Sequence, residues 1–155
     1  IKGIGPDKAV TICAAIELGR RLTYIYDKRK LENFSTPEKV SAFFMERLRH
    51  ETQEHFLVAF VNVKNRLLGY KEVSIGGLNE TPVDIKEAMK WAIRYKAFGL
   101  ILLHNHPSGY PEPSKEDIEM TKTFAKAAQL LDMEVLDHVI IGDGIYVSLH
   151  ERGVI

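Results

Sequence analysis

The sequence predicts an α/β protein in which a mixed β-sheet is flanked by helices. Two observations carry this prediction. Short apolar segments typical of strands alternate along the chain with longer segments whose apolar residues recur every three or four positions. The composition, 45% hydrophobic and 27% charged over 155 residues, is that of a globular chain with a core of its own, and it excludes a disordered or fibrous protein.

The predicted strands are apolar runs bounded by turn-forming residues. They span residues 55–63, 67–75, 99–104, 133–141 and 145–149. The first two should form a hairpin across Lys64–Asn65, and the last two a closing hairpin across residues 142–144. The strand over residues 99–104 stands alone between helices, which favours a mixed sheet over a purely antiparallel one.

Four helices are predicted from their start signals, because proline suits the first turn of a helix and serine or threonine caps it. The starts are expected at Pro6, Ser35–Glu38, Pro82 and Ser114. Helical spacing predicts the apolar face of the third helix as Ile85, Ala88, Met89, Ala92 and Ile93. The inward face of the fourth is predicted as Ile118, Thr121, Ala125 and Ala128.

Several function classes are excluded by what the chain lacks. The single cysteine, Cys13, rules out a disulfide framework and a zinc site made from paired cysteines, and we expect it to be buried on the first helix. Apolar runs such as Gly99–Leu103 are too short to cross a membrane. The chain begins at Ile1 without a charged-then-apolar leader, which predicts a fragment of a longer, cytoplasmic protein.

Charge divides the sequence into a basic head and a mildly acidic body. Residues 1–31 carry seven basic and three acidic side chains, whereas the whole chain has a net charge of zero. A neutral chain argues against a surface devoted wholly to nucleic acid. The polar, aperiodic stretch 27–33 is the predicted linker. We therefore expect a head with its linker over residues 1–30 and a main domain over residues 31–155.

The residues that carry chemistry lie within fourteen positions, from His104 to Asp117. Residues two apart on a strand point to the same side, so His104 and His106 can reach one metal ion. Asp117, in the first turn of the following helix, can fold back toward them. Two imidazoles and a carboxylate suit a hydrolytic zinc site and leave a fourth position for water. Taken separately, the histidines also fit surface polarity, and Ser114–Asp117 also fits a capping box.

The pattern His104-x-His106, followed after seven residues by Ser114-x-x-Asp117, resembles the JAMM, or MPN+, metallopeptidase motif. The full string HNHPSGYPEPSKED is similar to the RadC branch of that family. The resemblance extends to residues 3–9 and 137–142, and so covers nearly the whole chain. It implies a JAMM/MPN+, cytidine-deaminase-like architecture and a Zn²⁺ cofactor held by His104, His106 and Asp117.

The resemblance also implies catalytic roles for Glu54 and Ser114. The family places a glutamate at the start of a strand, where Glu54 stands in this sequence. Zinc lowers the pKa of bound water to about 7, and a carboxylate can then take and relay the proton. Glu51, three residues earlier, is the rival for this role. Ser114 would help to stabilise an oxyanion, a role that competes with helix capping for the same hydroxyl.

Two functions from different classes are therefore expected. The first is a zinc-dependent metallohydrolase acting on a peptide or isopeptide bond of an unidentified peptide or protein substrate. The second is a non-enzymatic, repair-associated adaptor with a structural or vestigial zinc site. The adaptor would bind DNA through residues 1–6, which resemble the hairpin of a helix-hairpin-helix module, with added charge from Lys2 and Lys8.

Other interpretations of the same residues fail on geometry or composition. HNH nucleases spread their motif over separate structural elements, so three consecutive residues do not reproduce it. A zinc deaminase would need a Pro-Cys-x-x-Cys segment, which one cysteine cannot supply. Asp137–His138 reads either as a pair supporting a metal ligand or as structural polarity, and we do not assign it to the catalytic residues.

Overall fold

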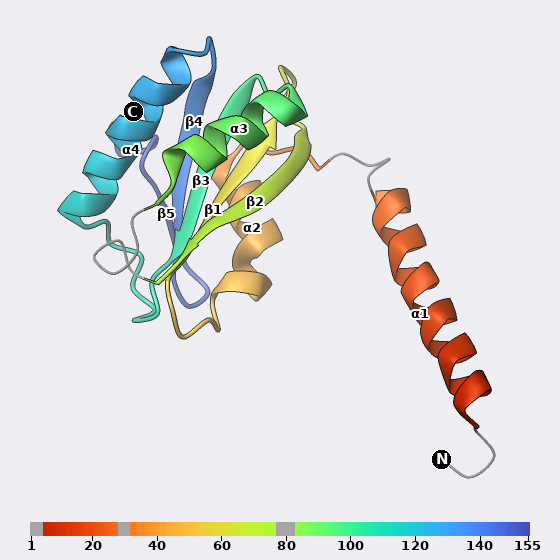
Figure 1. The fold of residues 1–155 in the computed structure, drawn as a ribbon. Coiled ribbons are helices and arrows are strands. Elements are labelled where there is room, and N and C mark those ends of the chain that lie inside the picture. Colours follow the sequence, from red (N-terminus) through yellow and green to blue (C-terminus); the bar gives the residue numbers. More distant parts are fainter. Residues whose placement is uncertain (1–4, 28–31, 77–82) are drawn as a thin grey trace. The chain divides into compact units, whose positions relative to one another are not determined.

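The computed structural model describes residues 5–27, 32–76 and 83–155, and the chain divides into two compact units over residues 1–32 and 33–155. The division falls beside the stretch predicted as a linker. In the first unit the described structure is helix α1 (Pro6–Asp27) (Figure 1). The elements of the second unit are α2 (Pro37–Leu48), β1 (His55–Val61), β2 (Leu67–Ile75), α3 (Ile85–Tyr95), β3 (Gly99–Asn105), α4 (Lys115–Gln129), β4 (Glu134–Ile141) and β5 (Tyr146–Ser148).

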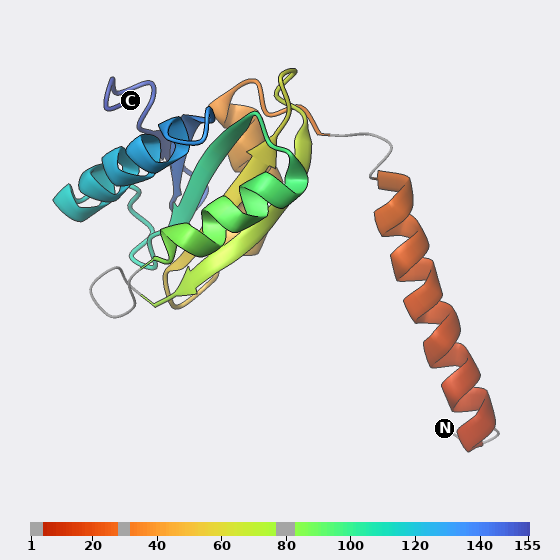
Figure 2. The same cartoon turned by 45° about the horizontal axis from the view of Figure 1, so that its top comes forward.

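The strands form one five-stranded sheet in the order β2-β1-β3-β4-β5. β3 pairs antiparallel with β1 and parallel with β4, and β2 and β5 join the two ends as antiparallel partners. Helices α3 and α4 cover one face of this sheet and α2 covers the other, as Figures 1 and 2 show from two directions. The predicted mixed sheet flanked by helices is confirmed.

Alternation along the strands divides the core into two layers, because successive side chains point to opposite faces. One layer packs beneath α3 and α4 and includes Phe56, Val58, Phe60, Leu100, Leu102 and Phe124. The other packs beneath α2 and includes Phe44, Leu48, Leu57, Ala59, Ile101, Leu103 and Val139. His104 continues the even-numbered series of β3, so it lies on the face covered by α3 and α4.

Strand β3 is buried along its whole length, which fixes the position of the residues at its end. Its register with β1 pairs His104 with Phe56. Glu54 directly precedes β1 and His106 directly follows β3, so both lie just beyond the paired ends of these two strands. The end of β3 and the start of β1 therefore bring together two segments that are distant in the sequence.

Three expectations about buried side chains are wrong. Cys13 is exposed on α1, as are Val10 and Ile16. Ile93 of α3 is 60% exposed, and the buried residues of that helix are Ala88, Met89 and Ala92. On α4, the buried side chains are Asp117, Thr121, Phe124 and Ala128, whereas Ile118 and Ala125 are only half-buried.

Helix α3 begins at Ile85 instead of Pro82, which lies outside the described residues. The Asp84 side chain caps it by accepting hydrogen bonds from the N–H groups of Lys86 and Glu87.

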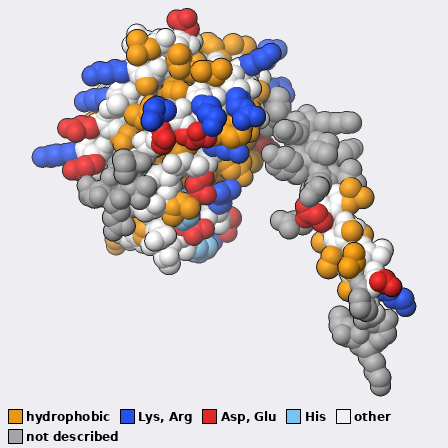
Figure 3. Space-filling model, in the orientation of Figure 1, with side chains coloured by type: hydrophobic (Ala, Val, Ile, Leu, Met, Phe, Trp, Pro, Cys, Tyr) orange, Lys and Arg blue, Asp and Glu red, His pale blue; other side chains and the backbone are white. Residues whose placement is uncertain are grey.

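In Figure 3, basic and acidic side chains are interspersed on the face that this view presents. Glu87 binds Lys90 at 3.0 Å, for example. That mixture agrees with the zero net charge of the chain.

None of the helices in the described part of the chain combines the length and the apolar character needed to cross a membrane.

Close backbone packing at Gly142 fixes the loop that follows β3. A Cβ atom at this position would overlap the carbonyl oxygen of Gly109 and lie 2.8 Å from the Cδ of Pro111. The Asp143 N–H donates to the same Gly109 carbonyl at 2.9 Å. The loop over residues 107–113 is therefore held against the turn between β4 and β5.

We expect Gly142→Ala to lower the free energy of unfolding by about 1–3 kcal/mol, because the added methyl group must displace backbone. Urea denaturation of the purified chain measures this change. Gly144→Asn is the matched control in the same turn. Gly144 has a φ of 71° and open space around it, and asparagine tolerates this conformation, so its cost should stay below about 1 kcal/mol. Equal stability of the Gly142→Ala variant and the original chain would contradict the packing argument.

Candidate metal centre

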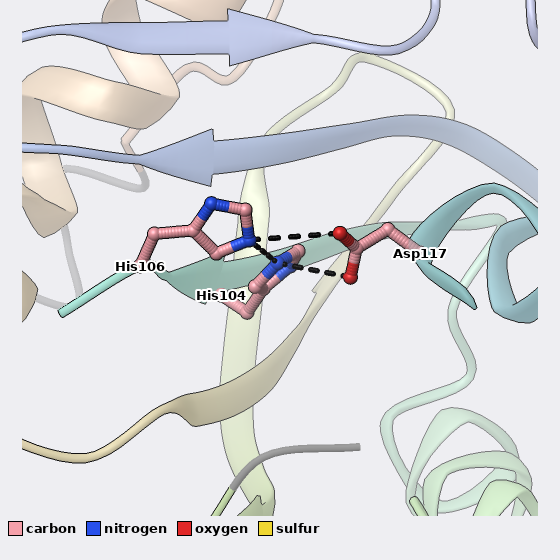
Figure 4. Close-up of side chains that lie close together, drawn as sticks. All are labelled: His104, His106 and Asp117. Atoms are coloured by element: carbon pink, nitrogen blue, oxygen red, sulfur yellow. Dashed lines mark hydrogen bonds and ion pairs between the residues drawn. The ribbon is translucent and has the colours of Figure 1, made fainter. Parts of the chain in front are cut away.

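The three predicted ligands come from the end of one strand and the start of one helix. His104 is the penultimate residue of β3, and His106 follows that strand. The His106 N–H donates to the Ile141 carbonyl of β4 at 2.9 Å, which extends the parallel pairing one residue beyond β3. Asp117 lies in the first turn of α4 and is 2% exposed. Figure 4 shows the three side chains pointing toward one another.

The ligand atoms converge closely. The Nε2 atoms of His104 and His106 are 3.0 Å apart. Asp117 Oδ1 lies 3.1 Å from His104 Nε2, and Asp117 Oδ2 lies 3.5 Å from His106 Nε2 (Figure 4). One ligand atom from each residue falls within 4.8 Å of the other two. Two imidazole nitrogens and a carboxylate, mostly buried and converging on one point, form a cluster that can bind a metal ion.

A backbone contact orients the ring of His106. Its Nδ1 lies 2.9 Å from the carbonyl oxygen of Tyr110. A carbonyl only accepts hydrogen bonds, so Nδ1 carries the hydrogen and donates it. In the neutral ring, Nε2 is then the nitrogen with a free lone pair, and this is the atom that faces the cluster. The loop held by Gly142 thus sets the orientation of this ring.

A capping box at the start of α4 orients Asp117. Its Oδ2 accepts from the Ser114 N–H at 2.7 Å and from the Ser114 hydroxyl at 2.6 Å, and the Asp117 N–H donates to that hydroxyl at 3.1 Å. The one hydrogen of the Ser114 hydroxyl is therefore directed to Asp117. The oxyanion role of Ser114 stays a prediction, and it requires this hydrogen to turn toward a substrate.

The electrostatics of the cluster favour a charged carboxylate. Burial alone would raise the pKa of Asp117, but its hydrogen bonds with His104, His106 and Ser114 outweigh burial and hold that pKa well below its usual range. The hydrogen bond with Asp117 is also the main cause that raises the pKa of His106. Asp117 therefore presents full negative charge to a bound cation.

Glu54 and its rival Glu51 lie in different surroundings. Glu54 is half-buried directly before β1, and its negative charge is the last among the causes that raise the pKa of His106. Glu51 is exposed and pairs with His55, with 3.5 Å between Oε2 and Nε2. The catalytic role of Glu54 stays a prediction.

The sequence analysis gave no role to Asn105, the residue between the two histidines. It is 1% exposed, and its side chain binds the backbone on both sides of Glu54. Oδ1 accepts from the His55 N–H at 2.8 Å, and Nδ2 donates to the Gln53 carbonyl at 3.0 Å. Asn105 thus ties the segment that carries Glu54 to the segment that carries the histidines. The partner of a buried amide is set by tertiary structure, and no local pattern reveals it.

His138 also contacts the cluster, as one of the two interpretations of the Asp137–His138 pair expects of a residue that supports a metal ligand. Its Nε2 lies 2.8 Å from His104 Nδ1. Its neighbour Asp137 does not share this contact, because its carboxylate accepts from the Ser148 hydroxyl at 2.8 and 2.9 Å. The two residues therefore point to opposite faces of β4, as the strand alternation requires.

The DNA-binding hairpin expected at residues 1–6 lies mostly outside the described residues, and its role stays a prediction.

The cluster should bind one divalent ion per chain. His104→Ala leaves two ligands, so metal affinity should fall by more than the roughly 10–100-fold that loss of an outer hydrogen-bond partner costs. Elemental analysis of the purified protein and titration with a chromophoric chelator measure occupancy and affinity. His50→Ala is a control, since His50 is exposed and lies outside the cluster. Stoichiometric metal in a His104→Ala/His106→Ala double variant would place the metal elsewhere.

Protons should compete with the metal for His106. Because the pKa of His106 is raised, its ring holds a proton up to a higher pH than an ordinary histidine does. Binding of a metal through Nε2 must release that proton, so affinity should fall as pH is lowered through the raised pKa, by about tenfold per pH unit. Chelator competition from about pH 8.5 to about pH 5.5 measures this slope. An affinity that is flat over this range would contradict coordination by His106.

Comparison with known proteins agrees with this geometry. The profile of a family described as "RadC-like JAB domain" matches residues 34–154. Two UPF0758 proteins, from Halalkalibacterium halodurans and Caldanaerobacter subterraneus subsp. tengcongensis, are each 49% identical over 155 residues, 99% of this chain. A UPF0758 protein from Desulforamulus reducens is 46% identical over 155 residues, 100% of this chain. The chain spans 66%, 65% and 68% of the length of these relatives, respectively. The matched region includes all three ligands of the cluster, and the chain belongs to the RadC-like JAB domain family.

Proposed function

We propose that the protein is a zinc-dependent hydrolase that cleaves peptide or isopeptide bonds. One observation carries the proposal: the ligand atoms of His104, His106 and Asp117 converge at the end of β3, and the half-buried Glu54 directly precedes β1, the strand paired with β3. Membership of a JAB domain family supports a hydrolytic reaction.

The donor set favours zinc. Two imidazoles and one carboxylate are the protein ligands of many hydrolytic zinc sites, and three ligands leave one coordination position for the reaction. Zinc bound there supplies Lewis-acid polarisation of the scissile carbonyl and activation of water. Hydrogen bonds within the chain orient the ligands around this coordination position. His106 is oriented by the Tyr110 carbonyl and Asp117 by Ser114.

Glu54 is the proposed proton carrier. Its carboxylate would accept a proton from the attacking water and return it to the leaving amine, so the carboxylate is unchanged at the end of the cycle. Asn105 would act as a positioning residue, because its amide holds the backbone at Gln53 and His55. Ser114 would donate to the oxyanion only if its hydrogen left Asp117.

The alternative function, a DNA-binding adaptor with a structural metal, differs in the number of ligands. Structural zinc sites are closed by four protein ligands. In the described part of the chain, the cluster comprises three such residues. The nearby His138 contacts His104 and Thr121, so it does not supply a fourth ligand. This arrangement favours an open site over a closed one.

Glu54→Gln tests the proposal most directly. Glutamine preserves the size of the side chain but cannot accept the proton, so turnover should fall by about 10²–10⁴-fold while metal occupancy is unchanged. The assay uses zinc-loaded protein with a panel of fluorogenic linear peptides and isopeptide-linked peptides. Elemental analysis of each sample reports its metal content.

Glu51→Gln is the matched control, because it makes the same chemical change three residues earlier at an exposed site. It should retain turnover close to that of the original chain. Hydrolysis that survives in Glu54→Gln and fails in Glu51→Gln would move the proton carrier to Glu51. Hydrolysis that is insensitive to both changes, or to removal of the metal, would contradict the proposed mechanism.

A further inference from the structure

A chain of buried side chains continues from the metal cluster into the protein. His104 Nδ1 contacts His138 Nε2 at 2.8 Å, and His138 Nδ1 contacts the Thr121 hydroxyl at 2.6 Å. That hydroxyl lies 2.6 Å from the backbone carbonyl of Asp117. The chain thus leaves one metal ligand, crosses from β3 to β4 and then to α4, and ends on the backbone of another ligand.

The direction of each hydrogen bond follows from the last group in the chain. A backbone carbonyl only accepts, and the Thr121 hydroxyl has one hydrogen, so that hydrogen points to the Asp117 carbonyl. Toward His138 the hydroxyl oxygen can then only accept. His138 Nδ1 therefore carries a hydrogen and donates it to Thr121.

The same logic passes through His138 to His104. His138 is 0% exposed, its two ring nitrogens contact Thr121 and His104, and burial disfavours the charged form, so the ring is neutral. With its hydrogen on Nδ1, the neutral ring has a lone pair on Nε2 and accepts a hydrogen bond there. His104 must therefore donate from Nδ1. Its Nε2, which lies 3.1 Å from Asp117 Oδ1, is then the nitrogen left for a metal, in exchange for any hydrogen that it shares with that carboxylate.

The surroundings keep water from replacing these contacts. The ring of Phe56 stacks on His104 with centroids 5.8 Å apart, and it meets the edge of His138 at 5.5 Å. Thr121 is 0% exposed. The contacts that link Thr121, His138 and His104 Nδ1 are thus shielded, and the order of donors and acceptors among these atoms follows from the Asp117 carbonyl.

We propose that Thr121 and His138 form a relay that fixes a hydrogen on Nδ1 of His104, so that Nε2 is the nitrogen left to bind the metal. This inference rests on metal binding by His104, as in the proposed function. Thr121 and His138 are positioning residues: they set which nitrogen of His104 carries a hydrogen before a metal arrives. Without the relay, the hydrogen of His104 can move to Nε2 and block coordination.

Thr121→Val tests the relay at its far end. Valine keeps the shape of threonine but removes the acceptor for His138, which can then carry its hydrogen on Nε2 and push the hydrogen of His104 to the metal side. We expect a loss of Zn²⁺ affinity of about 10–100-fold, the usual effect of losing an outer hydrogen-bond partner of a ligand. Competition with a chromophoric chelator measures this affinity. Thr121→Ser restores the hydroxyl and should restore the affinity.

Thr123→Val is the matched control. Its hydroxyl also donates to the carbonyl four residues earlier, Glu119, at 2.8 Å, but it lies on the exposed side of α4. It should leave Zn²⁺ affinity unchanged. Equal affinity in Thr121→Val and the original chain would overturn the relay, as would equal losses in Thr121→Val and Thr123→Val.

Nitrogen-15 NMR of the metal-free chain, labelled at histidine, reads the tautomer independently of metal binding. His104 Nδ1 should carry a hydrogen in the original chain and in Thr121→Ser, and a form without a hydrogen on Nδ1 should appear in Thr121→Val. A His104 Nδ1 without a hydrogen in the original chain would overturn the relay even if the protein binds zinc. The expected tautomer in a chain that binds no zinc would instead support the relay and refute the proposed function.

Discussion

The central constraint in this structure is the approach of two imidazole nitrogens and a carboxylate to within 3.0 to 3.5 Å of one another. Three groups rich in lone pairs at this distance are stable together only when protons or a cation lie between them. The chain must hold them there against their mutual repulsion. Burial of β3 along its whole length, with strands paired on both sides, supplies the rigid base for doing so.

Each ligand is fixed by a hydrogen bond from outside the cluster. His104 is held through Nδ1 by His138, His106 through Nδ1 by the Tyr110 carbonyl, and Asp117 by the hydroxyl and N–H of Ser114. The three supports come from a strand, a loop and a helix start, so no single element sets the geometry. A site supported in this way needs little rearrangement when its cation binds.

The features that could be predicted from sequence are those encoded by residues close together in the chain. The spacing of His104, His106 and Asp117 and the capping signal at Ser114 are local, and the predicted mixed sheet follows from the order of strands and helices. Asn105 and His138 could not be assigned, since the residues through which they contact the site, Gln53 and His55 for Asn105 and His104 for His138, lie 34 residues or more away. Helical spacing also placed Ile93 and Cys13 on buried faces, but it identifies an apolar stripe without showing whether another element covers it.

The two prediction failures on α1 and α3 have a common physical cause, because the burial of an apolar residue depends on its neighbours in space. In the same way, the position of Glu54 in the sequence does not determine which residues surround it. The sequence places it before β1, but the residues that it faces depend on the register of β1 with β3 and on the Asn105 side chain.

Asp117 serves the helix and the cluster with one carboxylate, and this double use affects how the sequence can change over time. A descendant that no longer used a metal would still need an acceptor for the free N–H and hydroxyl groups of Ser114 at the start of α4. The requirement on His106 is weaker, because the carbonyl that its ring binds belongs to Tyr110, which is 75% exposed, and water can donate to that carbonyl instead. Selection for folding alone would therefore preserve the aspartate while the histidine drifted, and an aspartate retained without its histidines would mark a RadC-like chain that has lost its metal.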